Sequence, residues 1–275
     1  MASGDWLGLA GRKVLVTGIA NRRSIAWHVH RGLIEAGAEP VHVVRDAATR
    51  EATAKLLDGF DVHVCDVERQ DEIDALAELL RSRGVRLAGL LHSIAFANYE
   101  GGVRPFHETE RADFLQAVDV SCFSLVALCR ALAPCLEGGA SVVTMSISHT
   151  HLAAESYGYM APVKAALDAA VVFLAKSLAA HEGRGVRVNA VKAGPLKTSS
   201  SAGIPGYLDN YLFAEQATLR HAALRTEEAA DAALYLLSPR SSGINAQGLV
   251  VDAGMGVNFF DADIVRRATA PERDA

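Results

Sequence analysis

The sequence predicts an α/β fold in which helices cover both faces of a doubly wound, seven-stranded parallel sheet. Seven short runs rich in apolar and β-branched residues recur along the chain, and longer segments with helical periodicity lie between them. Alternating strands and helices require right-handed crossovers, which place helices on both sides of a parallel sheet. The length of 275 residues, 50% of them hydrophobic, suits one large core. We therefore assign residues 1–275 to a single domain.

The expected strands are residues 13–17, 40–44, 61–65, 88–92, 141–147, 186–191 and 248–252. Helical spacing of apolar residues follows the first strand at Ile25, Val29 and Leu33 and precedes the sixth strand between Leu167 and Leu178. A long apolar segment, residues 114–136, is also expected to be helical. Residues 194–206, GPLKTSSSAGIPG, have a loop composition and open a short helix, so we predict a substrate lid around 196–220.

Composition excludes several classes of function. The 27 basic and 32 acidic residues are well mixed and give a net charge of −5, which favours neither nucleic acid nor an anionic membrane surface as a partner. The four cysteines form no CxxC pair and have no histidine at metal-ligand spacing, so we predict no metal site and a reduced, cytoplasmic chain. No signal-peptide run or membrane-spanning segment is apparent.

A candidate catalytic pair is Tyr157 and Lys164, seven positions apart where a helical pattern begins. Seven positions are close to two helical turns, so we expect both side chains on one face. A phenol beside an ammonium group can stabilise negative charge that develops on a bound oxygen. Taken alone, the pair is also compatible with a surface lysine that follows a core tyrosine.

A candidate phosphate loop follows the first strand as TGIANRRSIA, residues 17–26. Gly18 permits a sharp turn, and Ser24 stands at the mouth of the first helix, where free amides can bind a pyrophosphate. The glycine-rich G-x-G-x-x-G fingerprint is absent, so an ordinary turn with an N-cap serine is an equal alternative for this loop by itself.

Together these motifs resemble the divergent short-chain dehydrogenase/reductases that are enoyl-acyl-carrier-protein reductases, in which a G-x5-S-I-A loop replaces the glycine-rich one. The resemblance continues through CDV (65–67), HSIA (92–95), the Tyr157 and Lys164 pair, GVRVNAVKAGPLKT (185–198) and GLVVDAGMG (248–256). It covers residues 11–258. The Tyr-x6-Lys spacing separates this branch from ordinary members with Tyr-x3-Lys, whose tyrosine would fall at Met160.

The resemblance implies an NAD(P)-binding Rossmann domain that reduces the 2,3 double bond of a trans-2-enoyl thioester in fatty-acid or related acyl biosynthesis. The acyl chain would be carried by acyl carrier protein or coenzyme A. Tyr157 would face the thioester carbonyl, and Lys164 would bind the nicotinamide ribose. The implied cofactor contacts are Gly18, Ile19, Ser24, Ile25, Arg45, Asp66, Val67, Ser93, Ile94, Ala95, Lys164, Leu196 and Thr198. The implied substrate contacts are Ala97, Ile147, Tyr157, Met160, Ile204 and Tyr207.

The choice of cofactor depends on the end of the second strand, where Arg45 precedes Asp46. A basic residue there accommodates the 2′-phosphate of NADPH, whereas an acidic one binds the ribose 2′-hydroxyl of NADH. We therefore expect NADPH or NADH, with a slight preference for NADPH. The alternative is a surface arginine paired with a neighbouring acid.

Several residues depart from the resembled pattern. The fifth strand ends in aliphatic Ile147, which cannot donate a hydrogen bond, and strand alternation turns Ser146 and Ser148 away from its face. Ordinary ketone reduction is therefore disfavoured. His149 and His151 follow in the loop, either as solvated side chains or in a catalytic role. Two other functions stay open: a specialised reductase or dehydrogenase acting on another unsaturated or carbonyl substrate, and a catalytically idle nucleotide sensor.

A homo-oligomer, specifically a homotetramer, is expected because two helical stretches carry more apolar surface than one sheet face covers. Phe123, Leu125, Val126, Leu128 and Leu132 spread around the first, and residues 163–178 show a similar excess. Related reductases bury such helices against symmetry mates. The alternative is that loops of the same chain cover them.

Overall fold

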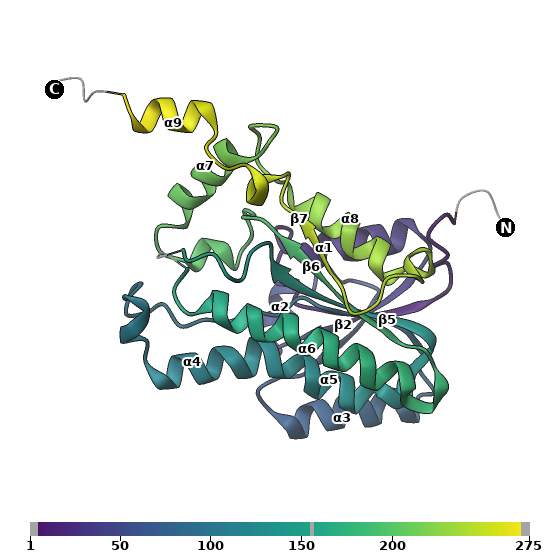
Figure 1. Cartoon of the computed structure of the whole chain (residues 1–275). Coiled ribbons are helices and arrows are strands. Elements are labelled where there is room, and N and C mark those ends of the chain that lie inside the picture. The colour runs from purple at the N-terminus through teal and green to yellow at the C-terminus, as the bar shows by residue number, and fades with distance from the viewer. Residues whose placement is uncertain (1–4, 155–156, 271–275) are drawn as a thin grey trace.

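The computed structural model describes residues 5–154 and 157–270, and within them it contains one seven-stranded, fully parallel sheet (Figure 1). The strand order is β3-β2-β1-β4-β5-β6-β7, so the predicted doubly wound architecture is confirmed. The strands are β1 (Lys13–Thr17), β2 (Glu39–Val44), β3 (Asp61–Val64), β4 (Leu87–His92), β5 (Leu136–Ile147), β6 (Arg187–Ala193) and β7 (Gly248–Val251).

The one large boundary difference is in β5, which starts at Leu136 and not at residue 141. The added segment contains Gly138 and Gly139, residue types that are depleted in strands, so the sequence did not indicate it. The register of β4 against β5 also shifts between Leu87 and Gly89. This part of β5 is therefore an irregular entry to the regular ladder.

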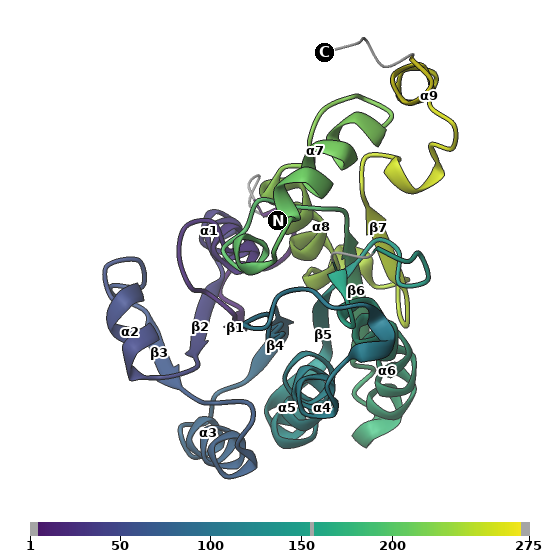
Figure 2. The same cartoon turned by 90° about the vertical axis from the view of Figure 1, so that its left-hand side faces the viewer.

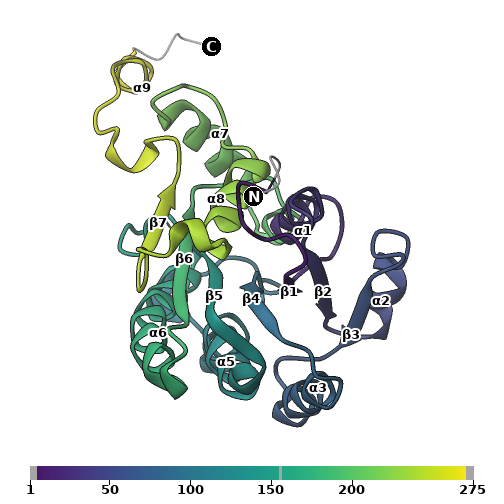
Figure 3. The same ribbon diagram turned by 90° about the vertical axis from the view of Figure 1, so that its right-hand side faces the viewer.

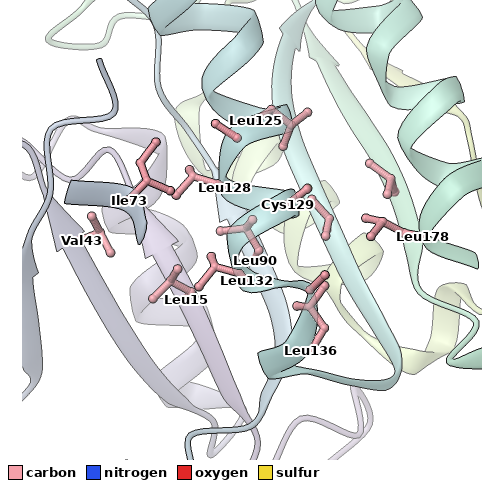
Figure 4. Packing of buried hydrophobic residues seen from close by; sticks show 14 of the residues in the cluster. Leu15, Val43, Ile73, Leu90, Leu125, Leu128, Cys129, Leu132, Leu136 and Leu178 are labelled. Atoms are coloured by element: carbon pink, nitrogen blue, oxygen red, sulfur yellow. The ribbon is translucent and has the colours of Figure 1, made fainter. Parts of the chain in front are cut away.

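Two layers of helices cover the sheet (Figures 1 and 3). One layer packs α3, α5 and α6 against a core that includes Leu15, Leu90 and Leu136 (Figure 4). The other packs α1 and α8 against residues such as Val16 and Val143. The helices are α1 (Ile25–Glu35), α2 (Ala47–Thr53), α3 (Gln70–Ser82), α4 (Arg111–Val118), α5 (Ser124–Leu132), α6 (Met160–Ala180), α7 (Tyr207–Ala217), α8 (Thr226–Leu237) and α9 (Ala262–Ala268).

The predicted helical stretch 114–136 is two α-helices joined by a π-helical segment, Asp119–Phe123. By length and composition the run Arg111–Cys135 could cross a membrane, but 61% of its apolar window is buried inside the fold. Leu125, Leu128 and Leu132 are all fully buried in the core. The run is therefore a core helix pair that covers the sheet.

The helix that carries Lys164 begins at Met160, so the expectation that Tyr157 shares this helix is wrong. Tyr157 lies in the preceding turn, followed by Gly158 with a φ of 54°. Pro162 falls in the first turn of the helix, where its missing N–H has no intrahelical acceptor to lose. Tyr157 is thus positioned by a turn, and Lys164 by the helix.

The carboxyl ends of all seven strands share one edge, as in any parallel sheet, and the sequence motifs follow these ends. The strand order reverses between β1 and β4, which is where doubly wound sheets bind their ligands. Above this edge lies the segment that contains α7, and α9 extends away from the body beside it (Figure 2).

Candidate active site

The crevice between β1 and β4 is closed by a very short approach of two backbones. The Thr17 hydroxyl accepts a hydrogen bond from the Ser93 amide at 3.2 Å and donates one to the Leu91 carbonyl at 3.0 Å. Gly18 has a φ of 87°, and a Cβ placed on it would lie 1.9 Å from the Ser93 carbonyl oxygen. Only glycine therefore fits at this point, at the mouth of the predicted cofactor site.

The loop from Gly18 to α1 is organised by the hydroxyl of Ser24, which accepts hydrogen bonds from the amides of Ala20 and Asn21 at 3.1 and 3.2 Å. The side-chain oxygen of Asn21 accepts from the Ser199 hydroxyl at 2.7 Å, which ties this loop to the segment before α7. The N-terminus of α1 opens on the same loop, as an anion site requires.

Lys164 is buried on α6 and donates a hydrogen bond from Nζ to the Met145 carbonyl at 2.8 Å. Burial lowers the pKa of Lys164 to about 8, and the negative charge of Asp168 acts in the opposite direction. An ammonium group has three donors, so the others can bind the hydroxyls of a sugar.

The Tyr157 hydroxyl has no hydrogen-bond partner among the described residues. Burial, together with the neighbouring phenols of Tyr99 and Tyr207, raises the pKa of Tyr157 well above its ordinary value. The phenol therefore keeps its proton at neutral pH and can donate it in a hydrogen bond to a bound oxygen.

The predicted substrate residues come from four parts of the chain, and Tyr207 is near enough to Tyr157 to affect its pKa. Ile147 ends β5, Met160 is buried in the core, and Ala97 packs against the same core from the loop after β4. Tyr207 opens α7, and its hydroxyl is bonded to the amide and the carbonyl of Leu196 at 2.8 Å each. Ile204 lies between η6 (Ser201–Gly203) and α7.

The predicted contacts of the adenosine half lie at the ends of β2 and β3. Arg45 is exposed, and its Nε donates to Asp46 Oδ2 at 2.8 Å. Hydrogen bonds from the Thr49 amide and hydroxyl and from Arg45 lower the pKa of Asp46 to about 2. The carboxylate of Asp66 accepts from the Glu68 amide at 3.1 Å. Along the same edge lie the other predicted cofactor residues: Ile19, Ile25, Val67, Ile94, Ala95, Leu196 and Thr198.

Sequence reasoning missed three partners of these residues. Tyr159 accepts from the Asn98 amide and donates to the Asn98 carbonyl, both at 2.9 Å, and so fixes the loop after β4. Asp168 accepts from Lys192 at 2.6 Å beside Lys164. Asp252 bonds His149. Tyr159 and Asp168 follow Tyr157 and Lys164 closely in the sequence, but nothing in the sequence joins Asp252 to residue 149.

Comparisons with known proteins point to one family. The family model described as "Enoyl-(Acyl carrier protein) reductase" matches residues 18–256. The FabI enoyl-[acyl-carrier-protein] reductase [NADH] of a Nostoc species is 35% identical over 254 residues, covering 90% of this chain and 97% of that protein. The NADPH-dependent FabI of Staphylococcus aureus is 32% identical, with 90% and 98% covered.

Solved structures give the same result. The Bacillus cereus enoyl-acyl carrier protein reductase with NADP+ and indole naphthyridinone superposes with a TM-score of 0.86 at 31% identity, covering 91% of this chain and 98% of that one. The Aquifex aeolicus enoyl-[acyl-carrier-protein] reductase (NADH) gives a TM-score of 0.85 at 30% identity, with 90% and 98% covered. The chain therefore belongs to the enoyl-(acyl-carrier-protein) reductase family.

Proposed function

We propose that this chain reduces the 2,3 double bond of a trans-2-enoyl thioester, with Tyr157 and Lys164 as its catalytic residues. When bound, reduced NADPH or NADH supplies a hydride to the β-carbon, the electron pair of the double bond moves toward the thioester carbonyl oxygen, and a proton from solvent then adds to the α-carbon. Tyr157 holds that oxygen by a hydrogen bond that strengthens as negative charge grows. Lys164 binds the ribose hydroxyls and adds positive potential beside the phenol.

The residues at the switch point fit a dinucleotide. The close approach of Gly18 to Ser93 leaves a smooth backbone surface, and the N-terminus of α1 supplies amides for a pyrophosphate. A buried lysine with unused donors is costly unless a polar ligand satisfies it, and a ribose does so. These features support the assignment of Lys164 to the nicotinamide ribose.

One observation carries the proposal: Tyr157 is a buried, protonated phenol whose hydroxyl has no partner in the described part of the chain, and it lies in the turn that precedes the helix bearing the buried ammonium group of Lys164. A protein that only sensed the nucleotide would have no use for this phenol, so the arrangement argues against an idle sensor. Aliphatic Ile147 offers no second donor at the end of β5. Tyr157 is therefore the proposed donor to the carbonyl oxygen.

We further propose a slight preference for NADPH. The Nε of Arg45 is bonded to Asp46, but the side chain is 64% exposed at the end of β2, and no bond to its two terminal nitrogens is found among the described residues. They can therefore bind the 2′-phosphate, which a charge-assisted pair favours. The family includes relatives named for either cofactor.

The segment 196–220 is the proposed lid over the acyl chain. Leu208, Leu212 and Phe213 on α7 are 59%, 46% and 59% exposed, so this helix presents an apolar face that a fatty acyl chain could cover. The acyl chain would arrive on acyl carrier protein or coenzyme A. All four cysteines are free and buried, in keeping with a reduced cytoplasmic setting.

A homotetramer is proposed because two separate apolar surfaces lack a cover among the described residues. One lies on α4, the π-helical segment and α6, where Leu115, Phe123 and Phe173 are 53%, 51% and 77% exposed. The other is the open edge of the sheet at β7, where Val250 is 47% exposed. Two different self-complementary interfaces generate a D2 tetramer. Light scattering tests this: a stable 29.1 kDa species would contradict it.

The reaction itself is tested by NADPH oxidation with crotonyl thioesters of coenzyme A and of acyl carrier protein. We expect oxidation only when an enoyl thioester is present. Tyr157→Phe should lower turnover about 100- to 1000-fold, the usual loss for such a donor, with NADPH affinity unchanged. Tyr235→Phe, on α8 across the sheet, is the matched control. Equal effects of the two substitutions would remove Tyr157 from the site.

A further inference from the structure

The loop that leads from β5 to Tyr157 is held to a distant part of the chain by His149. The Ser148 amide first donates to the Ala193 carbonyl at 2.8 Å, which continues the ladder between β5 and β6. His149 then reaches past β6, and its Nε2 lies 3.2 Å from Oδ2 of Asp252. Asp252 directly follows β7, so this one contact joins the ends of two strands that are not neighbours.

Asp252 is buried and organises the turn 252–256 without help from His149. Its Oδ1 accepts from the Gly254 amide at 2.9 Å, and its Oδ2 accepts from the Gly256 amide at 3.0 Å. A carboxylate with two backbone donors is already largely satisfied. Removing the imidazole therefore leaves the turn itself intact, and only the link to the β5 loop is lost.

The imidazole of His149 packs directly against Gly256. A Cβ built on Gly256 would be 1.5 Å from Nε2 of His149 and 2.2 Å from its Cε1. Real Cβ atoms do not approach so closely, so any side chain at residue 256 would expel the ring. The position of His149 is therefore fixed by shape as well as by its hydrogen bond. Its neighbour His151 is exposed, with its ring centroid 6.1 Å away.

The same turn also holds the end of the proposed lid. The Leu219 amide, just after α7, donates to the Ala253 carbonyl at 3.0 Å. Gly254 has a φ of 78°, and a Cβ on it would lie 2.4 Å from Cδ1 of Leu219. The turn 252–256 is thus in contact with the β5 loop on one side and with the end of the lid on the other.

We propose that His149 is a positioning residue for enoyl reduction: its imidazole, packed against Gly256 and bonded to Asp252, holds residues 148–154 against the turn that anchors the lid. Ala154, at the end of this segment, accepts a hydrogen bond from the Tyr157 amide at 3.0 Å. This role rests on the function proposed above. Small errors in the placement of a catalytic group are costly, because an error of about 1 Å can lower the rate about 100-fold. His149 itself touches neither substrate nor cofactor in this proposal.

If His149 is a positioning residue, its replacement should lower turnover and leave the affinity for the cofactor unchanged. His149→Ala should lower kcat for crotonyl-coenzyme A about 10- to 100-fold, and the Kd for NADPH should change less than about twofold. His149→Gln, whose amide carries an N–H at a similar distance from the backbone, should recover most of this loss. A merely structural role would lower folding stability and cofactor affinity together, and glutamine would not restore kcat.

The contact of the His149 imidazole with Gly256 and Asp252 is called the latch below. A double-mutant cycle distinguishes loss of the latch from other effects of the substitutions. Gly256→Ala expels the imidazole and should reproduce the kcat of His149→Ala, whereas in the His149→Ala background it should have no further effect. Gly243→Ala, where a Cβ meets nothing within 4 Å, is the matched control. Additive losses in the double variant, or an unchanged kcat in His149→Ala, would overturn the proposal.

Amide hydrogen exchange of residues 148–154 tests the latch without relying on enoyl reductase activity. Both single variants should raise exchange in this loop, and the double variant should exchange no faster than either one. If the wild-type protein reduces no enoyl thioester, the proposed function fails, but this measurement still decides whether His149 and Gly256 form a latch. Exchange that is equal in wild type and variants would contradict the latch itself.

Discussion

Gly18→Ala is the sharpest test of the crevice between β1 and β4. The added methyl carbon would lie 1.9 Å from the Ser93 carbonyl oxygen and 2.7 Å from its carbonyl carbon, whereas ordinary contacts begin near 3.4 Å. Both are backbone atoms of Ser93, which directly follows β4, so the overlap can be relieved only by moving the loop at residues 17–24 or the chain after β4. Either movement displaces groups proposed to hold the dinucleotide.

The size of the effect follows from two contributions. A residue other than glycine with φ near 87° costs about 1–2 kcal/mol, and forced overpacking costs about 1–3 kcal/mol more. Gly11→Ala isolates the first contribution, because Gly11 has a φ of 70° and a Cβ there meets nothing within 4 Å. We therefore expect losses in the free energy of unfolding of about 2–5 kcal/mol for Gly18→Ala and about 1–2 kcal/mol for Gly11→Ala.

Denaturant unfolding measures both losses, and titration calorimetry with NADPH measures the consequence for the site. Affinity should fall at least about tenfold in Gly18→Ala, which corresponds to about 1.4 kcal/mol, and should be unchanged in Gly11→Ala. Equal stabilities and equal affinities of the two variants would refute the reasoning, because they would show that the approach of Gly18 to Ser93 constrains nothing.

Three further predictions concern charge. NADPH affinity should decline as pH rises through about 8, where buried Lys164 loses the proton that its ribose contact needs; constant affinity up to pH 9.5 would exclude this role. Arg45→Glu should shift the preference toward NADH by repelling the 2′-phosphate, and an unchanged ratio of the two kcat/KM values would show that Arg45 does not bind it. Buried His30 and His42 have pKa values lowered to about 4 and about 3, chiefly by burial, so the fold holds them neutral and stability should be lost as pH falls below about 6.5. His42→Leu should reduce this loss by about 1.6 kcal/mol between pH 6.5 and pH 5 in denaturant titrations; identical slopes would contradict it.

The sequence by itself determined the fold class, because strands buried on both faces appear as continuous apolar runs whatever their order in space. Six of the seven strands begin and end within two residues of their predicted bounds, and motifs such as Gly18 and Ser93 follow directly from strand ends. Their meeting at one edge is a consequence of parallel strands. The start of β5 was not predictable, because Gly138 and Gly139 are residues of a type that is depleted in strands.

Only the tertiary structure decided how the active site is held in place. Local spacing predicted Tyr157 and Lys164 on one helix, but the helix begins at Met160 and the phenol is positioned by a turn. The link between His149 and Asp252 spans 103 residues. It also depends on the absence of a side chain at Gly256, where the imidazole packs, and no local sequence pattern indicates this contact. Contacts of this kind arise from packing between distant segments, so sequence periodicity, which reports only a residue's own neighbourhood, carries no signal for them.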